Sequence, residues 1–234
     1  MRIFIFAVLI TSSFNAFADT VEVVFFGGHA SSPEQMRCWE KGARAESSRQ
    51  HDYNFRGVAY PAGAHYSRQA ALSGSRAEVQ RLVNEINANP NKRYVIAGHS
   101  SGAAISNQVA SLVKNPRQID LINLDGFAPS RELQDRVGSS KCWYAVNPGS
   151  GGTSLNAGSM RGCRNSAKVT SATCRTSMCL HFAMVNSGAP ATLSNYRKDG
   201  YNSCRTNLEW LRDLENTSAA APRRSTGPRA SSVR

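Results

Sequence analysis

The stretch Tyr94-Val95-Ile96-Ala97-Gly98-His99-Ser100-Ser101-Gly102 decides the fold that the rest of this sequence must fit. It joins a short apolar run, typical of a buried strand, to a segment with apolar side chains at helical spacing. A Gly-x-Ser-x-Gly motif in that position forms a sharp turn, with glycines where Cβ atoms would not fit. We therefore expect Ser100 to adopt a strained backbone conformation that exposes its hydroxyl at the carboxyl end of a sheet.

Strand and helix patterns alternate along the chain. This alternation predicts an α/β fold, in which a single domain has a mostly parallel sheet with helices on both faces. Right-handed crossovers would place the carboxyl ends of the strands along one edge, and we expect an active site there. A Ser-x-x-Glu capping box at residues 75–78 predicts the start of one amphipathic helix. Strands are expected at 21–26, 54–60, 93–97, 119–124, 142–146 and 167–170, and further helices at 33–49, after Gly102 and around 208–214.

The two ends of the chain differ in composition from its middle. Residues 1–18 hold one arginine, an apolar run and then Ala16-Phe17-Ala18, the pattern of a signal peptide cleaved after Ala18. The alternative is a buried N-terminal strand, and the run is shorter than the roughly 20 residues of a membrane span. Residues 19–216 are expected to form the domain, and residues 217–234 a basic disordered tail. The protein is therefore predicted to be secreted or periplasmic.

Six cysteines follow the predicted signal peptide. An even number in an exported chain predicts disulfides, although six cysteines allow many pairings and the sequence does not choose among them. No Cys-x-x-Cys pair or Cys/His cluster suggests zinc, so we expect neither a metal nor a cofactor. The pairing that we favour is Cys174–Cys179, Cys142–Cys163 and Cys38–Cys204.

The formal net charge of +12 makes the chain strongly basic. Such a surface is attracted to an anionic envelope surface, such as acidic polymer or lipid, although an ordinary soluble basic surface is the simpler interpretation. The sequence shows no aromatic-studded platform of the kind that binds nucleic acid, so no specific nucleic-acid partner is expected. We expect a monomer that acts on a small-molecule or lipid substrate.

The residues that could activate Ser100 occur in a definite order. A serine hydroxyl needs a base, usually a histidine oriented by a carboxylate, and on this type of sheet the order is Ser, Asp or Glu, His. His181 is the one histidine after the motif and lies ahead of the last predicted helix, and a Cys174–Cys179 bridge would stiffen the short loop that leads to it. Asp125 directly follows the strand at 119–124, whereas Asp120 begins that strand at the wrong end of the sheet. The alternatives are a structural role for His181 and a turn role for Asp125 before Gly126.

Backbone amides are the expected partners of a developing oxyanion. One is the amide of Ser101, the residue after the nucleophile, and the other comes from the loop after the first strand, at Gly28 or His29. A plain Gly-Gly turn is the alternative for that loop. His99 is expected to pack within the sharp turn rather than to act as a base.

With these residues in order, residues 21–214 resemble a small member of the α/β-hydrolase superfamily. The chain is similar to cutinases and other minimal secreted esterases, because the leading antiparallel strands of the full fold are missing. An acid at Asp125, one strand beyond the nucleophile, is similar to thioesterase domains, and the usual position one strand later is Asn147-Pro148-Gly149, which holds no carboxylate. The resemblance implies a Ser-His-Asp mechanism, an acyl-enzyme and no cofactor.

The function that these features predict is a secreted or periplasmic serine hydrolase of carboxylic esters. A non-catalytic binding protein on the same scaffold is one alternative, and an acyltransferase or thioesterase with the same triad is another. Residues 147–162, rich in glycine and serine, fit either a mobile substrate loop or a simple surface connection.

Overall fold

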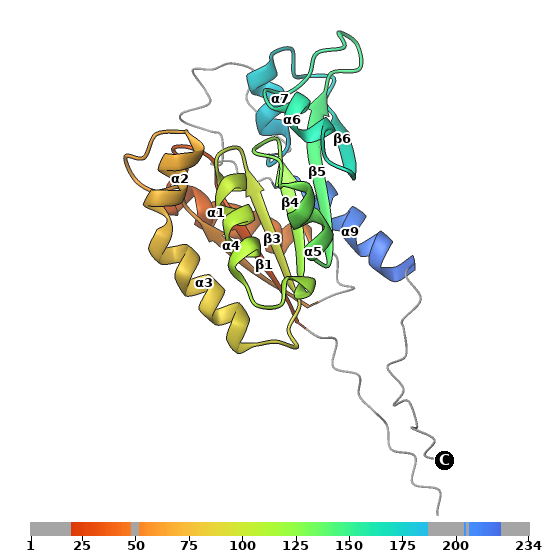
Figure 1. The fold of residues 1–234 in the computed structure, drawn as a ribbon. Helices are drawn as coiled ribbons and strands as arrows, with labels where there is room; N and C mark the ends of the chain where they lie inside the picture. The colour runs from red at the N-terminus through yellow and green to blue at the C-terminus, as the bar shows by residue number, and fades with distance from the viewer. Residues whose placement is uncertain (1–19, 48–51, 187–203, 205, 221–234) are drawn as a thin grey trace, which may run out of the picture.

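The computed structural model describes residues 20–47, 52–186, 204 and 206–220, shown in colour in Figure 1. The predicted signal peptide and most of the predicted tail lie outside these residues. The described part contains the six strands β1 (Val21–Phe26), β2 (Tyr53–Val58), β3 (Tyr94–His99), β4 (Ile119–Leu124), β5 (Ser139–Val146) and β6 (Ser166–Thr170).

The six strands form one sheet in the order β2-β1-β3-β4-β5-β6, and every neighbouring pair is parallel. The predicted α/β fold is therefore confirmed. From β1 the chain winds outward to β2 and then returns to β3 on the other side of β1 (Figure 1). A reversal of this kind separates the loops that leave the two central strands, and ligands of open α/β sheets bind in the resulting crevice.

Helices cover both faces of the sheet (Figure 1). Successive side chains of β1 point to opposite faces, so Val23 and Phe25 belong to one core and Val24 and Phe26 to the other. The first core is covered by α1 (Pro33–Glu46), α7 (Ser177–Ala183) and α9 (Glu209–Ala220), and the second by α2 (Arg68–Gly74), α3 (Arg76–Ala88), α4 (Gly102–Leu112) and α5 (Arg131–Arg136).

Three predictions about local structure need correction. The helix predicted from the capping box at residues 75–78 is present and begins after Ser75, but the box itself does not form, because α2 leads directly into α3 and the Ser75 hydroxyl donates to the Ala71 carbonyl (2.7 Å) instead of capping α3. Residues 147–162 contain a short helix, α6 (Ala157–Arg161), and Thr153 pairs with Val146. The last helix continues to Ala220, four residues beyond the predicted end of the domain at residue 216.

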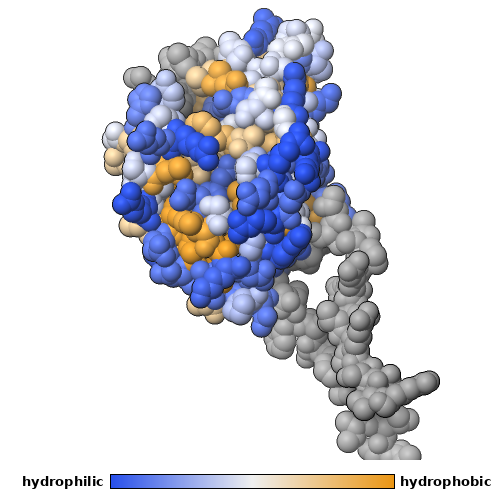
Figure 2. All heavy atoms as spheres, in the orientation of Figure 1, coloured by the Kyte–Doolittle hydropathy of each residue, from blue (hydrophilic) through white to orange (hydrophobic). Residues whose placement is uncertain are grey.

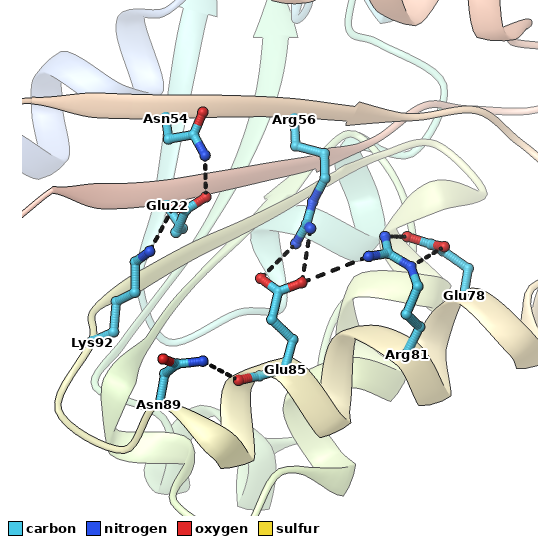
Figure 3. A network of polar contacts seen from close by, with 8 residues as sticks. All are labelled: Glu22, Asn54, Arg56, Glu78, Arg81, Glu85, Asn89 and Lys92. Atoms are coloured by element: carbon cyan, nitrogen blue, oxygen red, sulfur yellow. Dashed lines mark hydrogen bonds and ion pairs between the residues drawn. The ribbon is translucent and has the colours of Figure 1, made fainter.

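A polar network ties the edge of the sheet to α3 (Figure 3). On β2, the Arg56 guanidinium donates two hydrogen bonds to the Glu85 carboxylate of α3 (2.8 and 3.1 Å). Glu22 of β1 accepts from Asn54 (2.8 Å) and from the Lys92 ammonium (2.7 Å). Such partly exposed pairs add little stability one by one. Placed together, they occupy the outer strand with charged groups and so disfavour pairing with another chain.

Three disulfides join all six cysteines, and they are the pairs that we favoured from the sequence. Bonds of this kind persist in oxidising compartments, so they are compatible with an exported protein. In the described ranges, no helix combines the length and apolar character that crossing a bilayer requires. The pairs are Cys38–Cys204, Cys142–Cys163 and Cys174–Cys179.

The first core predicts a large effect of a single substitution. Phe25 is fully buried and stacks on Trp39 with ring centroids 4.3 Å apart. Phe25→Ala removes both the transfer energy of the ring and its packing, so we expect the free energy of unfolding to fall by about 3–5 kcal/mol. Leu112→Ala, at a half-exposed position, should cost about 1 kcal/mol or less. Urea titration of the two variants checks this, and equal losses would contradict the assignment of Phe25 to the core.

Candidate active site

The sharp turn after β3 has the geometry that its glycines require. Ser100 follows the strand with a φ of 54°, and α4 begins two residues later at Gly102. A Cβ on Gly98 would lie 2.5 Å from the Gly102 carbonyl oxygen, and one on Gly102 would lie 2.3 Å from the Phe26 carbonyl oxygen. A side chain at Gly98 would therefore push β3 away from α4, and a side chain at Gly102 would push α4 away from β1.

Backbone strain is concentrated in the loops at this edge of the sheet. Among the described residues, four non-glycine residues have a positive φ, and three of them lie in the loops that leave β1, β3 and β4. Left-handed conformations of such residues cost of order 1–3 kcal/mol each and persist where the surroundings enforce them, most often at functional sites. The three residues are Ala30 (φ 65°), Ser100 (φ 54°) and Asp125 (φ 43°).

Asp125 and His181 form a buried pair. The His181 Nδ1 lies 2.5 Å from the Asp125 Oδ2, and both side chains are almost inaccessible to solvent. Because a carboxylate accepts hydrogen bonds, Nδ1 carries the hydrogen, which leaves Nε2 as the acceptor. His181 belongs to α7, a helix that the sequence analysis did not predict and that begins after the Thr176 cap. The Cys174–Cys179 disulfide joins the preceding loop to the first turn of that helix.

Asp120, which the sequence analysis placed at the wrong end of the sheet, and the later Asp213 do not join this pair. Asp120 begins β4 and pairs with the Arg93 guanidinium (2.5 Å) at the amino end of the sheet. Asp213 pairs with the Lys141 ammonium. Asp199 lies outside the described residues. The geometry therefore brings Asp125 to the histidine and keeps Asp120 and Asp213 away from it.

Two residues that the sequence analysis missed hold Asp125. The Ser154 hydroxyl donates to the Asp125 Oδ1 (2.7 Å), and the Asn156 amide donates to the same oxygen (3.1 Å). The Asn156 side chain donates to the Asp125 carbonyl (2.7 Å). Both residues come from the Gly/Ser-rich segment after β5, and no motif marks them. The one feature of the sequence that could have indicated them is that these two polar residues flank Leu155, a large apolar residue in a segment of mostly small residues.

His99 lies directly behind the histidine of the pair. Its ring packs against that of His181 at a tilt of 38°, with centroids 4.3 Å apart, and its Nε2–H donates to the His181 carbonyl (3.0 Å). Complete burial lowers the pKa of His99 well below its ordinary value, and the neighbouring His181 adds to the effect. His99 is therefore a neutral residue that packs within the turn, as its place in the motif suggested.

Ser100 and His181 line one pocket of about 340 Å³. The pocket also receives Tyr66, a 61% exposed side chain from the loop before α2, and Leu155, which is 50% exposed. These apolar residues were not predicted, because the pocket draws its lining from several loops and from α7, and residues so far apart in the chain leave no pattern in the sequence. The remaining lining residues are His29, Ser101, Phe127, Asn156 and Met178.

Two of the three predicted oxyanion residues reach the pocket. His29 and Ser101 line it, whereas Gly28 is not among its lining residues. Within the described part of the chain, the amides of His29 and Ser101 form no hydrogen bond, so both donors remain available. The Ser101 hydroxyl donates to the Tyr66 carbonyl (2.7 Å) and so holds that residue at the pocket.

A larger hollow of about 610 Å³ lies between α2, α3 and α4. Figure 2 shows exposed hydrophobic surface between α3 and α4, surrounded by hydrophilic residues. Its lining contains arginines, glutamines and aliphatic residues but no acid–base pair, so the smaller pocket is the candidate active site. In the ranges that the structure describes, no three His, Cys, Asp or Glu side chains converge as a metal ion would require.

Among comparisons with known proteins, solved structures alone give matches. No family model matches the chain, and no curated protein matches it. Solved structures that are similar include an extracellular α/β-hydrolase from a Paenibacillus species (17% identity, 47% of this chain and 42% of that chain, TM-score 0.33). A protein of the α/β-hydrolase superfamily from Xanthomonas campestris pv. campestris shares 14% identity over 82% of this chain and 99% of that chain (TM-score 0.41).

A thioesterase from the prodiginine pathway of Streptomyces coelicolor shares 12% identity over 77% of this chain and 85% of that chain (TM-score 0.42). The match spans less than half the length of the Paenibacillus protein. The Paenibacillus and Xanthomonas proteins are described as α/β-hydrolases, the superfamily that the sequence resembles. Their identities with this chain are low, so we argue its function from the site alone.

The neutral state of His99 predicts a pH dependence of stability. In the unfolded chain a histidine binds a proton below pH of about 6.5, whereas the folded state keeps His99 neutral to lower pH. The unfolded state therefore binds more protons, and stability should fall as pH decreases below about 6.5, by up to about 1.4 kcal/mol per pH unit from this group.

His99→Gln retains a side-chain donor but does not titrate, so its free energy of unfolding should depend less steeply on pH between 5 and 6.5. Urea titrations at several pH values measure this difference in slope, with His65→Gln as the matched control at an exposed histidine. Identical slopes for the wild type and His99→Gln would contradict the prediction.

Proposed function

We propose that the protein is an exported serine hydrolase that cleaves carboxylic esters. One observation carries the proposal, namely that the bond from His181 Nδ1 to Asp125 leaves Nε2 as an acceptor in a pocket that also holds Ser100. The strained turn at Ser100 supports it, because an exposed hydroxyl on such a turn is the usual arrangement of a nucleophile on this type of sheet.

The proposed reaction has two steps. The His181 Nε2 takes the proton of Ser100 while the oxygen attacks the ester carbonyl, and the same nitrogen then protonates the leaving alcohol. Asp125 keeps the ring in the required tautomer and stabilises its charged form. The amides of Ser101 and His29 donate to the oxyanion. Water, activated in the same way, then releases the acid and restores the serine.

The pocket supports an uncharged, apolar acyl group as the part of the substrate that is bound. Tyr66, Phe127, Leu155 and Met178 bring apolar surface to it, and its lining holds no lysine, arginine or carboxylate. Burying each methylene of a substrate against such surface contributes about 0.8 kcal/mol. Its volume of about 340 Å³ is at the lower end of the range for ligand pockets, which favours short acyl chains.

Turnover of p-nitrophenyl butyrate tests the proposal. Ser100→Ala should lower kcat/KM by roughly 10⁴-fold or more, because the attacking oxygen is removed. Ser106→Ala is the matched control, since it removes a buried hydroxyl from α4 that donates to the Ala103 carbonyl within the helix. A fluorophosphonate should label Ser100 in the wild type and in the control.

The other classes give different results in the same assay. Absence of both turnover and labelling would contradict the proposal and indicate a binding protein on this scaffold. Transfer of the acyl group to an added alcohol, in place of release of free acid, would indicate an acyltransferase. A strong preference for a thioester over the matched oxygen ester would indicate a thioesterase.

Export is part of the proposal and has its own test. The apolar run and Ala16-Phe17-Ala18 support cleavage after Ala18, and the three disulfides are compatible with an oxidising compartment. Mass spectrometry of the protein recovered from the periplasm or medium of an expressing cell should give a chain that begins at Asp19. Recovery of the chain only from the cytoplasm, with Met1 intact, would contradict it. Attraction of the basic surface to an anionic envelope and a monomeric state both remain predictions.

A further inference from the structure

Residues 154–156 form one short segment that contacts both the acid and the pocket. Ser154 and Asn156 point toward Asp125, to which both donate hydrogen bonds. Leu155, between them, lies in the pocket lining and is half exposed. A displacement of the backbone at Leu155 would therefore also move Ser154 and Asn156, the two residues that hold the carboxylate.

Ser154 is fixed in one orientation. Its hydroxyl oxygen accepts from the Ala145 amide of β5 (3.0 Å), and its own amide donates to the Ala145 carbonyl (2.9 Å). A hydroxyl has a single hydrogen, and with the oxygen already accepting, that hydrogen is directed to the Asp125 Oδ1 (2.7 Å). The sheet thus sets the position of Ser154, and Ser154 sets the position of one carboxylate oxygen.

Asn156 fixes the backbone of Asp125. Its side-chain amide donates to the Asp125 carbonyl (2.7 Å), at a residue held with a φ of 43°. Its main-chain amide is the second donor to Oδ1 (3.1 Å). With Oδ1 held by two donors and the backbone by a third, the remaining oxygen, Oδ2, is directed at the His181 Nδ1.

We propose that residues 154–156 couple binding of the acyl group to orientation of the acid. In this scheme Leu155 is a specificity-determining residue that contacts the acyl chain, and Ser154 and Asn156 are positioning residues that act through Asp125. The inference rests on the proposed hydrolase function of the same pocket. An acyl chain that packs on Leu155 holds the segment in place, so part of the binding energy appears in kcat rather than only in KM.

Kinetics on p-nitrophenyl esters from acetate to hexanoate test this coupling. Ser154→Ala should lower kcat roughly 10- to 100-fold for every ester and leave KM within about twofold, since a hydrogen bond to a charged group is lost. Ser154→Thr, which keeps the hydroxyl, should recover most of that loss. Ser75→Ala is the matched control, because it removes a buried hydroxyl with an equally short bond (2.7 Å) far from the pocket.

Leu155→Ala separates the two roles, and at its half-exposed position the substitution should cost little stability. The kcat/KM for hexanoate should fall about tenfold more than the kcat/KM for acetate, with a measurable part of that additional loss in kcat. A loss confined to KM would overturn the coupling. Equal losses for acetate and hexanoate would overturn the role of Leu155 in specificity.

A measurement without substrate keeps this inference separate from the proposed function. The hydrogen on the His181 Nδ1 should give a low-field proton NMR signal that disappears in Asp125→Asn. The signal should shift in Ser154→Ala and stay in place in Ser75→Ala. An unmoved signal together with full kcat in Ser154→Ala would overturn the positioning role. A shifted signal in a protein with no turnover would instead refute the hydrolase proposal and retain the positioning of Asp125.

Discussion

The structure of the site depends on the close approach of three backbone segments at one edge of the sheet. Gly102 lies against the carbonyl oxygen of Phe26, and a Cβ on Gly126 would lie 2.2 Å from the carbonyl oxygen of Ser100. The loops after β1, β3 and β4 are thus in contact through main-chain atoms, at positions where only glycine fits. This contact holds Ser100 and Asp125 in left-handed conformations that they would not adopt alone, and it leaves the amides of His29 and Ser101 facing the same pocket.

Most of the fold could be predicted because strands buried on both faces have nearly continuous apolar sequences. The runs at Val21–Phe26 and Ile119–Leu124 match β1 and β4 residue for residue. The Ser-x-x-Glu pattern predicted the start of α3 correctly, with Ser75 at the cap position, but not the capping hydrogen bond, because a second helix ends at the same serine and uses its hydroxyl. A local pattern of this kind predicts the capping hydrogen bond only when the serine does not also end a preceding helix.

The site was predictable to the extent that chain order constrains it. The serine, the acid and the histidine follow from the motif, from the carboxyl ends of the strands and from the order in which they occur. The groups around them do not follow, because Ser154, Asn156 and Tyr66 reach the site through turns whose directions depend on the packed structure. The same limit applies to α7, the helix that carries His181 and that no pattern in the sequence predicted. The position of His181 after the motif identified it as a candidate, whereas the sequence did not indicate that it lies on a helix.

The position of α7 late in the chain has a consequence for how the proposed activity arises during folding. The turn at Ser100 and the acid at Asp125 belong to the central strands, but the base comes from a helix more than fifty residues farther on, which a disulfide joins to the loop before it. A chain that has emerged only through β6 would hold the nucleophile and the carboxylate and still lack the proton acceptor. The proposed hydrolysis would therefore begin only once the C-terminal part has folded onto the sheet.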